Sequence, residues 1–343
     1  MSSTAVVAWR HLRAAPARVA GWWLSPLPRA RVAWLRVVVY AFVFADVFWL
    51  TPWVGDNGLV PGDLYHPLMI GRLLPLPTPT PVIVDIVKYT MLACAAVAAT
   101  GRFVRLAGAA VFCLYLEWMV IAFSYGKVDH DRVAFLVALA VLPTVGKVSW
   151  RDKTSDEKAA WAIRCIQVAV IATYFLSAFA KIRFGGVEWV NGATLLRAVL
   201  RRGTDLAEPL TTMPWVLHMG QWLIMLFELS SPLMLARGWV GRLYLASAVL
   251  FHTITYLTIR IVFWPHLVCL LAFCPLERVD RLHGHLTGPR ASRTSRPRKP
   301  LLATSDRYKT STSERRKRLA SSFPSRESHG IARKVSITAA PPE

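Results

Sequence analysis

The chain has 343 residues, of which 54% are hydrophobic, and its mean hydropathy is +0.39. Soluble globular domains are less apolar than this, so the composition argues against a soluble enzyme. It instead predicts a membrane protein, because several apolar runs reach the roughly 17 to 25 residues that a helix needs to cross the hydrocarbon layer. The expected fold is an all-α, polytopic membrane helical bundle.

The net charge of +21 is uneven along the chain, and about half of it lies after Pro275. The sequence shows no zinc-finger, basic-zipper or similar reading pattern, so no nucleic-acid partner is expected. Basic residues next to apolar helices more commonly contact lipid. The predicted partners are therefore the lipid bilayer and, through the basic arm and tail, anionic lipid head groups.

The cysteines give no sign of a metal or redox site. All five lie inside apolar runs, and none forms a C-x-x-C pair. Cysteines in such surroundings usually act as small packing residues. The sequence therefore predicts neither a disulfide framework nor a bound metal.

The first part of the chain alternates basic or polar segments with apolar runs. Residues 1–31 form a basic arm whose tryptophans and arginines suit the lipid head-group layer. A first span is predicted over residues 32–50. Residues 51–81 are rich in Gly and Pro and are expected to form an extended external loop. Second and third spans follow over residues 82–100 and 106–123.

A polar segment, residues 123–132, separates the third span from a short fourth span over residues 133–145. It contains Lys127, Asp129, His130, Asp131 and Arg132. Asp131 is expected to cap the fourth span, since a carboxylate is favourable at a helix N-terminus. A charged loop over residues 147–158 precedes the fifth span, residues 159–180.

The last part of the membrane region begins with a predicted interfacial helix over residues 191–202, in which leucines and arginines lie on different sides. Spans six to eight follow over residues 213–236, 240–259 and 261–275. The total is about eight spans, or seven if the final pair is re-entrant. The domains are thus a basic arm (1–31), a transmembrane domain (32–278) and a disordered basic tail (279–343), which is too poor in aromatic residues to build a core.

The positive-inside rule gives an orientation. The sequence predicts a multi-pass protein of a bacterial cell membrane with both termini in the cytoplasm. In this orientation most basic loops and the whole tail lie on the cytoplasmic side. The segment 181–214 is the exception, because it is basic and yet falls outside. Either an interfacial helix or a functional site explains that exception.

Ionisable side chains inside predicted spans are candidates for function, because burying an unpaired charge in a membrane is costly. They are Arg36, Asp46, Glu117, His218, Glu228 and His252. In the predicted orientation Asp46, Glu117 and His252 lie toward the external face, where His130 and Lys181 also lie. These five are expected to share an outward-facing pocket. Hydrogen bonds between helices, with no further function, are the alternative for each of them.

Lys181 follows directly after the fifth predicted span, between Phe179 and Phe184. Such a lysine can extend its ammonium group to water beside the membrane surface. If the amine is desolvated instead, it loses its proton more readily and becomes a usable base. Both interpretations remain open from the residues alone.

Four motifs resemble a known family. They are the segment 123–132, the run Tyr174-Phe175-Leu176-Ser177-Ala178-Phe179-Ala180-Lys181-Ile182 leading to Trp189-Val190-Asn191-Gly192, Phe227-Glu228-Leu229 with Pro232, and Phe251-His252. Together they resemble the bacterial HTTM (horizontally transferred transmembrane) domain family, whose membrane domain is similar to that of vitamin K-dependent gamma-carboxylase. The resemblance covers residues 31–278.

The resemblance implies roles for two residues. Lys181 matches the motif lysine that deprotonates the quinol, and His130 matches the histidine that assists the oxygenation site. It also implies a quinone or quinol cofactor. However, the spacer between Lys181 and Trp189 is longer than in the carboxylase, and the large extracytoplasmic substrate-binding domain has no counterpart, so carboxylation of a peptide glutamate is not expected.

Two functions remain as hypotheses. The first is a quinol-coupled or related oxidoreductase-type membrane enzyme with an outward-facing site, in which Lys181 is the catalytic base and His130 is its catalytic partner. The second is a non-catalytic permease or an export and maturation partner, in which buried groups such as Glu228 only bind or move a ligand.

Overall fold

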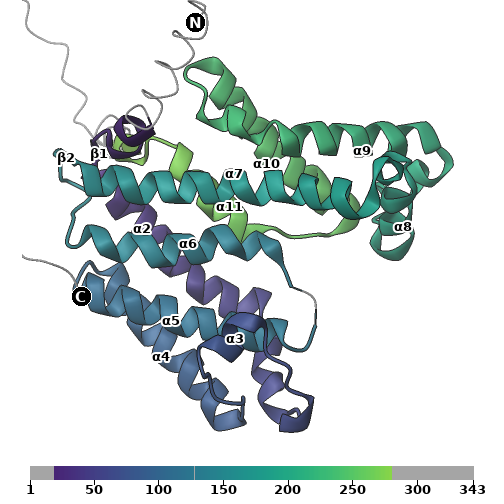
Figure 1. Cartoon of the computed structure of the whole chain (residues 1–343). Coiled ribbons are helices and arrows are strands. Elements are labelled where there is room, and N and C mark those ends of the chain that lie inside the picture. The colour runs from purple at the N-terminus through teal and green to yellow at the C-terminus, as the bar shows by residue number, and fades with distance from the viewer. Residues whose placement is uncertain (1–18, 127, 280–343) are drawn as a thin grey trace, which may run out of the picture. The chain divides into compact units, whose positions relative to one another are not determined.

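The computed structural model describes residues 19–126 and 128–279, which are mostly helical (78%). Most of the predicted basic arm, Lys127 and nearly all of the predicted disordered tail lie outside the described residues. The helices, shown in Figure 1, are α2 (Arg29–Ala45), α3 (Met69–Leu73), α4 (Pro81–Ala99), α5 (Val104–Phe123), α6 (Val133–Val141), α7 (Glu157–Gly185), α8 (Ala193–Arg202), α9 (Pro214–Leu229), α10 (Trp239–Ile259) and α11 (Trp264–Leu270). A two-residue strand, β1 (Leu27–Pro28), pairs antiparallel with β2 (Ser155–Asp156).

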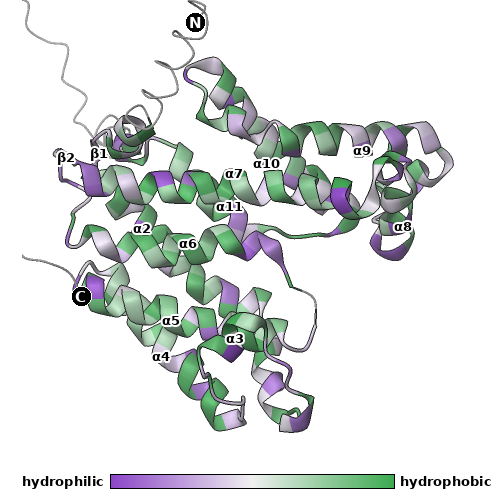
Figure 2. Cartoon of the chain, viewed as in Figure 1, coloured by the Kyte–Doolittle hydropathy of each residue, from purple (hydrophilic) through white to green (hydrophobic). Residues whose placement is uncertain are grey.

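Within the described part of the chain, five helical segments are long and apolar enough to cross a membrane. They are Arg29–Leu50, Pro81–Ala99, Val104–Phe123, Glu157–Gly185 and Trp239–Ile259. The protein is therefore a candidate multi-pass membrane protein, and Figure 2 shows hydrophobic residues along most of the length of these helices. The other three predicted spans are also helical, but α6, α9 and α11 are short and continue only as 3₁₀ turns. The count of eight spans stays a prediction.

Helix α7 is central to the packing. It contacts α6, α2, α9 and α11 (Figure 1). Helices α2, α4 and α5 form a second group. At Gly108, α5 lies against the Tyr40 hydroxyl of α2 and against Pro143 in the turn that follows α6. A Cβ atom at this position would lie 2.6 Å from Cγ of Pro143, so only glycine fits here.

Two predicted boundaries are wrong. The segment 51–81 is not simply an extended loop, because it contains the 3₁₀ helix Pro52–Leu59 and the short helix α3. The fifth helix does not end at Ala180. It continues to Gly185 and stops at Gly186, whose φ of +61° suits a glycine. Lys181 therefore lies inside a helix rather than beyond one.

The predicted cap of the fourth helix is also wrong. The N-cap position of α6 is occupied by Arg132, with no side-chain capping bond, and Asp131 lies in the preceding 3₁₀ turn, η4 (His130–Arg132). The amphipathic segment 191–202 is helical, as α8, and buries Val199 while Arg201 and Arg202 stay exposed. The location of α8 at the membrane interface stays a prediction.

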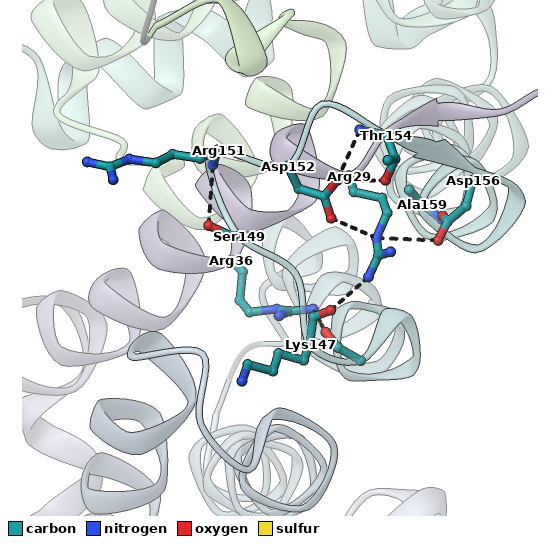
Figure 3. Close-up of polar contacts among 10 residues, drawn as sticks. Arg29, Arg36, Lys147, Ser149, Arg151, Asp152, Thr154, Asp156 and Ala159 are labelled. Atoms are coloured by element: carbon teal, nitrogen blue, oxygen red, sulfur yellow. Dashed lines mark hydrogen bonds and ion pairs between the residues drawn. The ribbon is translucent and has the colours of Figure 1, made fainter.

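A polar cluster joins the start of α2 to the loop before α7 (Figure 3). Arg29 donates to the carbonyl of Lys147 at 2.8 Å and pairs with Asp152 and Asp156 at 3.3 and 3.6 Å. Asp156 also accepts the Ala159 N–H at 2.6 Å, which caps α7. The cluster therefore determines where α7 begins relative to α2.

Arg36 is buried inside α2 and has a structural explanation. Its Nη2 atom donates to the carbonyls of Leu142 and Gly146 at 3.0 and 2.9 Å, as Figure 3 shows in part. These carbonyls belong to the end of the α6 segment, where backbone acceptors lack helical partners. A cation is favourable at that end of a helix. Arg36 thus joins α2 to α6 and does not line a ligand site.

We expect Arg36→Met to destabilise the protein by about 2 to 4 kcal/mol, because two buried carbonyls lose their charged donor. Unfolding of the purified protein in detergent by denaturant would measure the change. The matched control is Arg102→Met at an exposed turn position, which should change stability by less than about 0.5 kcal/mol. Equal effects of the two substitutions would contradict the assigned role of Arg36.

Candidate functional site

A cavity of about 470 Å³ lies among α7, α8, α9, α10, α11 and the η4 turn. Most of its lining is apolar and includes Leu195, Val199, Leu217, Phe251, Ile254 and Phe263. The polar side chains in the lining come mainly from α7, α9, α10, α11 and η4. A cavity of this size and character is typical of a site for a small, largely apolar ligand.

The first polar group of the cavity is an ion pair between Lys181 of α7 and Glu228 of α9. Lys181 Nζ lies 2.5 Å from both carboxylate oxygens of Glu228 and also donates to Ser177 Oγ at 2.9 Å. Ser177 Oγ donates to Glu228 Oε1 at 3.3 Å. The glutamate side chain is 7% exposed and the lysine side chain 22%, so the pair is largely shielded.

Trp189 covers this ion pair from the segment that follows α7. Lys181 Nζ lies 5.2 Å from the centre of the Trp189 ring, a distance at which cation–π attraction operates. The backbone carbonyl of Trp189 accepts a hydrogen bond from Gln221 Nε2 of α9, which ties the segment down. The indole therefore helps to hold the ammonium group in position beside Glu228.

A second polar group consists of Tyr174 from α7, His252 from α10 and His266 from α11. Tyr174 Oη and His252 Nε2 share a hydrogen bond of 2.6 Å. The His266 ring packs against the Tyr174 ring with the centroids 4.6 Å apart and lies 5.7 Å from the His252 ring. Tyr174, His252 and His266 are all buried, and all three line the cavity.

The η4 turn brings His130 and Asp131 to the same cavity. His130 faces Phe263, with the ring centroids 6.4 Å apart, and Phe263 in turn packs on His252 at 5.0 Å. The turn is anchored from behind by Arg132, whose Nη1 atom donates to Asp46 Oδ1 at 2.5 Å. The position of His130 thus depends on a buried ion pair one layer away.

Asp46 is the centre of that buried network. Tyr115 Oη donates to Asp46 Oδ2 at 2.9 Å and accepts from Arg132 at the same distance. Thr51 Oγ1 donates to the Asp46 carbonyl at 3.0 Å and accepts from Trp118 Nε1 at 3.1 Å. Asp46 begins the π-helical turn η1 (Asp46–Leu50), an irregularity that lets its carboxylate reach these partners.

Asp131 lines the cavity from the η4 turn, outside the predicted spans, and its carboxyl is buried. Burial raises the pKa of its carboxyl from 3.8 to about 6, against the lowering influence of neighbouring Arg132. Asp129 and Asp46 add to the rise because their negative charges disfavour a further carboxylate. Asp131 therefore changes charge just below neutral pH.

Of the residues predicted to share an outward-facing pocket, the structure brings three together. Lys181, His130 and His252 line the cavity, and Glu228, predicted only as a buried polar candidate, joins them. Asp46 does not line the cavity and acts on it only through Arg132. Glu117 does not line it either, and so the expectation of five residues in one pocket is wrong for these two.

His218, the remaining span candidate, is exposed on α9 and accepts a hydrogen bond from Trp222 at 3.3 Å. His266, Tyr174 and Ser177 were not predicted as individual site residues. His266 carried a usable signal, because it is an ionisable residue inside the apolar segment 261–275. Tyr174 and Ser177 precede Lys181 by seven and four residues, a spacing that places all three on one face of a helix.

Comparison with known proteins adds no family: no family model, curated protein or solved structure matches this chain. Among the described residues, no group of three or more His, Cys, Asp or Glu side chains could hold a metal ion. The groups that the cavity itself presents are a largely shielded ammonium–carboxylate pair able to exchange a proton, and hydrogen-bonding rings, within an apolar lining.

We expect Glu228→Gln and Lys181→Met each to cost about 3 kcal/mol of stability, because each leaves a largely buried charge without its partner. The double variant should cost less than the sum of the two, since it removes both charges. Denaturant unfolding of the four proteins in detergent gives the coupling energy. Glu188→Gln, at an exposed position, is the control. Strictly additive costs would contradict a specific pair.

We expect Asp131→Asn to make the protein more stable than the wild type at pH 7.5 but not at pH 4. The wild-type carboxyl has a folded-state pKa of about 6 and an ordinary value of 3.8. Its favourable contribution is complete below 3.8 and is lost as the pH rises through 6, a change on the order of 3 kcal/mol. Thermal unfolding across this range tests it. Asp56→Asn, at an exposed position, is the control substitution.

Proposed function

We propose that this chain is a membrane protein that binds a lipid-soluble hydroquinone in its cavity and removes a hydroxyl proton from it, as part of a quinol-coupled oxidoreductase-type activity. The observation that carries the proposal is the Lys181–Glu228 pair, which lines an otherwise apolar cavity. Paired ionisable groups in a low-dielectric site are suited to proton transfer.

The lining selects the class of ligand. A largely apolar wall disfavours sugars, nucleotides and other strongly hydrated molecules, because their polar groups would lose water without gaining partners. An aromatic ring with a hydroxyl group and a hydrocarbon tail satisfies both parts of the cavity. Hydroquinones of the membrane have this structure.

The proton step uses both members of the pair. The Glu228 carboxylate accepts the proton of the ligand hydroxyl, and the Lys181 ammonium stabilises the oxyanion that remains. The bond broken is O–H of the ligand, and the bond formed is O–H of the Glu228 carboxyl. Lys181 becomes a base only after its own proton has passed to Glu228, 2.5 Å away. The deprotonated hydroquinone is more easily oxidised than the neutral form.

His130 is proposed as a hydrogen-bond partner of the ligand, since it lines the same cavity. This assignment is compatible with the role that the resemblance to the HTTM family and the gamma-carboxylase membrane domain implies for His130. For Lys181 the resemblance implies the base itself, a role that the lysine takes here only after its proton has passed to Glu228. We also retain from the sequence the eight-span arrangement, the cytoplasmic termini and lipid contacts of the basic arm. The Lys181 side chain is 22% exposed and that of Glu228 7%, which supports a site largely shielded by protein.

The second candidate, a permease or an export partner, is favoured by one observation. The Lys181–Glu228 pair and its cavity could hold a ligand without any chemical step, because binding alone needs no proton acceptor. The two candidates differ in whether hydroquinone is consumed. If the protein binds the hydroquinone and moves it across a vesicle membrane without oxidising it, the permease function is supported.

We expect the purified full-length protein to bind decylhydroquinone and to oxidise it to the quinone with dioxygen as the two-electron acceptor, which is reduced to hydrogen peroxide. Lys181→Ala and Glu228→Gln should each lower turnover by about 100-fold or more, the usual contribution of a positioned acid or base. Lys158→Ala, at an exposed position outside the cavity, is the matched control and should keep full turnover. Unchanged turnover in a correctly folded Lys181→Ala variant would rule out the proposed chemistry.

A further inference from the structure

The buried histidine of α11 is not explained by the proton step. His266 is 1% exposed, and neither of its ring nitrogens has a hydrogen-bond partner in the described part of the protein. Buried polar atoms are nearly always paired, because an unpaired one is destabilising. His266 nevertheless lines the cavity, so its possible partners include a ligand atom.

The neighbouring histidine repeats this pattern. His252 uses Nε2 for Tyr174, while its Nδ1 atom is buried and has no partner among the described residues. The His252 and His266 rings lie 5.7 Å apart, centre to centre. Three ring nitrogens that have no partner among residues 19–126 and 128–279 are therefore gathered at one part of the cavity wall.

This part of the wall is separated from the ion pair along α7. Tyr174, which contacts both histidines, precedes Lys181 by seven residues on the same face of the helix. At 1.5 Å of rise per residue the separation is about 10 Å along the helix axis. The cavity thus has polar groups at two levels, and the apolar side chains account for the rest of its lining.

The rings are held rigidly at their level. Tyr174 packs edge-to-face on both His266 and Phe227, and Phe263 packs on His252. Pro265 at the start of α11 sets the backbone direction just before His266. Preorganised donors of this kind favour a ligand oxygen over a flexible polar chain.

We propose that His266, together with His252, binds a second oxygen of the ligand, at the end opposite to the hydroxyl that meets Lys181 and Glu228. A para-hydroquinone suits both levels of the cavity, because its two oxygens lie on opposite sides of the ring. This inference rests on the proposed function and adds the residues that hold the second oxygen of the ligand. His266 is a binding residue here and takes no part in the proton step.

The test compares decylhydroquinone with decylphenol, which has the same tail and ring but only one oxygen. Binding of each to the full-length protein in detergent is measured by calorimetry. We expect the wild type to bind decylhydroquinone roughly three- to tenfold more tightly, the effect of one additional hydrogen bond. His266→Phe should abolish this preference while leaving decylphenol affinity unchanged.

Two further variants complete the design. His266→Gln keeps a hydrogen-bonding side chain and should retain part of the preference, whereas His218→Phe removes an exposed histidine outside the cavity and should change nothing. Retained decylphenol binding shows that each variant is folded. If His266→Phe does not fold, the wild-type preference and the His266→Gln variant decide the question.

Three results would overturn the inference. Equal wild-type affinity for the two compounds removes the second oxygen site while leaving the proposed function intact. A preference that survives His266→Phe shows that the second oxygen is bound elsewhere. Failure of the wild type to bind either compound overturns this inference together with the proposed function.

Discussion

Charged side chains buried among apolar helices need specific partners, and three such pairings join the helices of this protein. Arg36 of α2 meets backbone carbonyls at the end of the α6 segment, Asp46 meets Arg132, and Lys181 meets Glu228. Each pairing connects elements that are far apart in sequence. Because an unpaired ion in such surroundings is costly, these contacts restrict how the helices can pack much more than apolar contacts alone do.

The pairings differ in what they serve. The Arg36 contacts and the Asp46 network are fully enclosed, and they hold α2, α5, α6 and the η4 turn together. The Lys181–Glu228 pair borders the cavity, and so the same physical requirement that unites α7 and α9 also presents a proton-exchanging group to a ligand. Arg132 connects the two roles, since the residue that satisfies Asp46 also holds His130 and Asp131 at the cavity wall.

The apolar runs predicted the helices well, because hydrophobic length is a local property of sequence. Residue types inside those runs also singled out Lys181, His130, Glu228 and His252, all of which line one cavity. What could not be predicted is which buried ions face each other. Asp46 and Glu117 were assigned to the pocket by depth alone, yet depth does not say toward which neighbour a side chain points. The end of α7 could not be predicted for a different reason. The apolar run ends just before Lys181, whereas the backbone stays helical to Gly185.

The length of α7 has a consequence for the proposed multi-pass arrangement in a bilayer. Its 29 residues extend for about 43 Å, whereas the hydrocarbon layer is about 30 Å thick. The excess is taken up by tilt or by emergence of the helix into the head-group region. Lys181 lies near one end of this helix, so the thickness of the surrounding lipid bears directly on how deep the ammonium group sits. The acyl-chain length of the surrounding lipids, which sets the thickness of the hydrocarbon layer, is thereby a physical variable of the site.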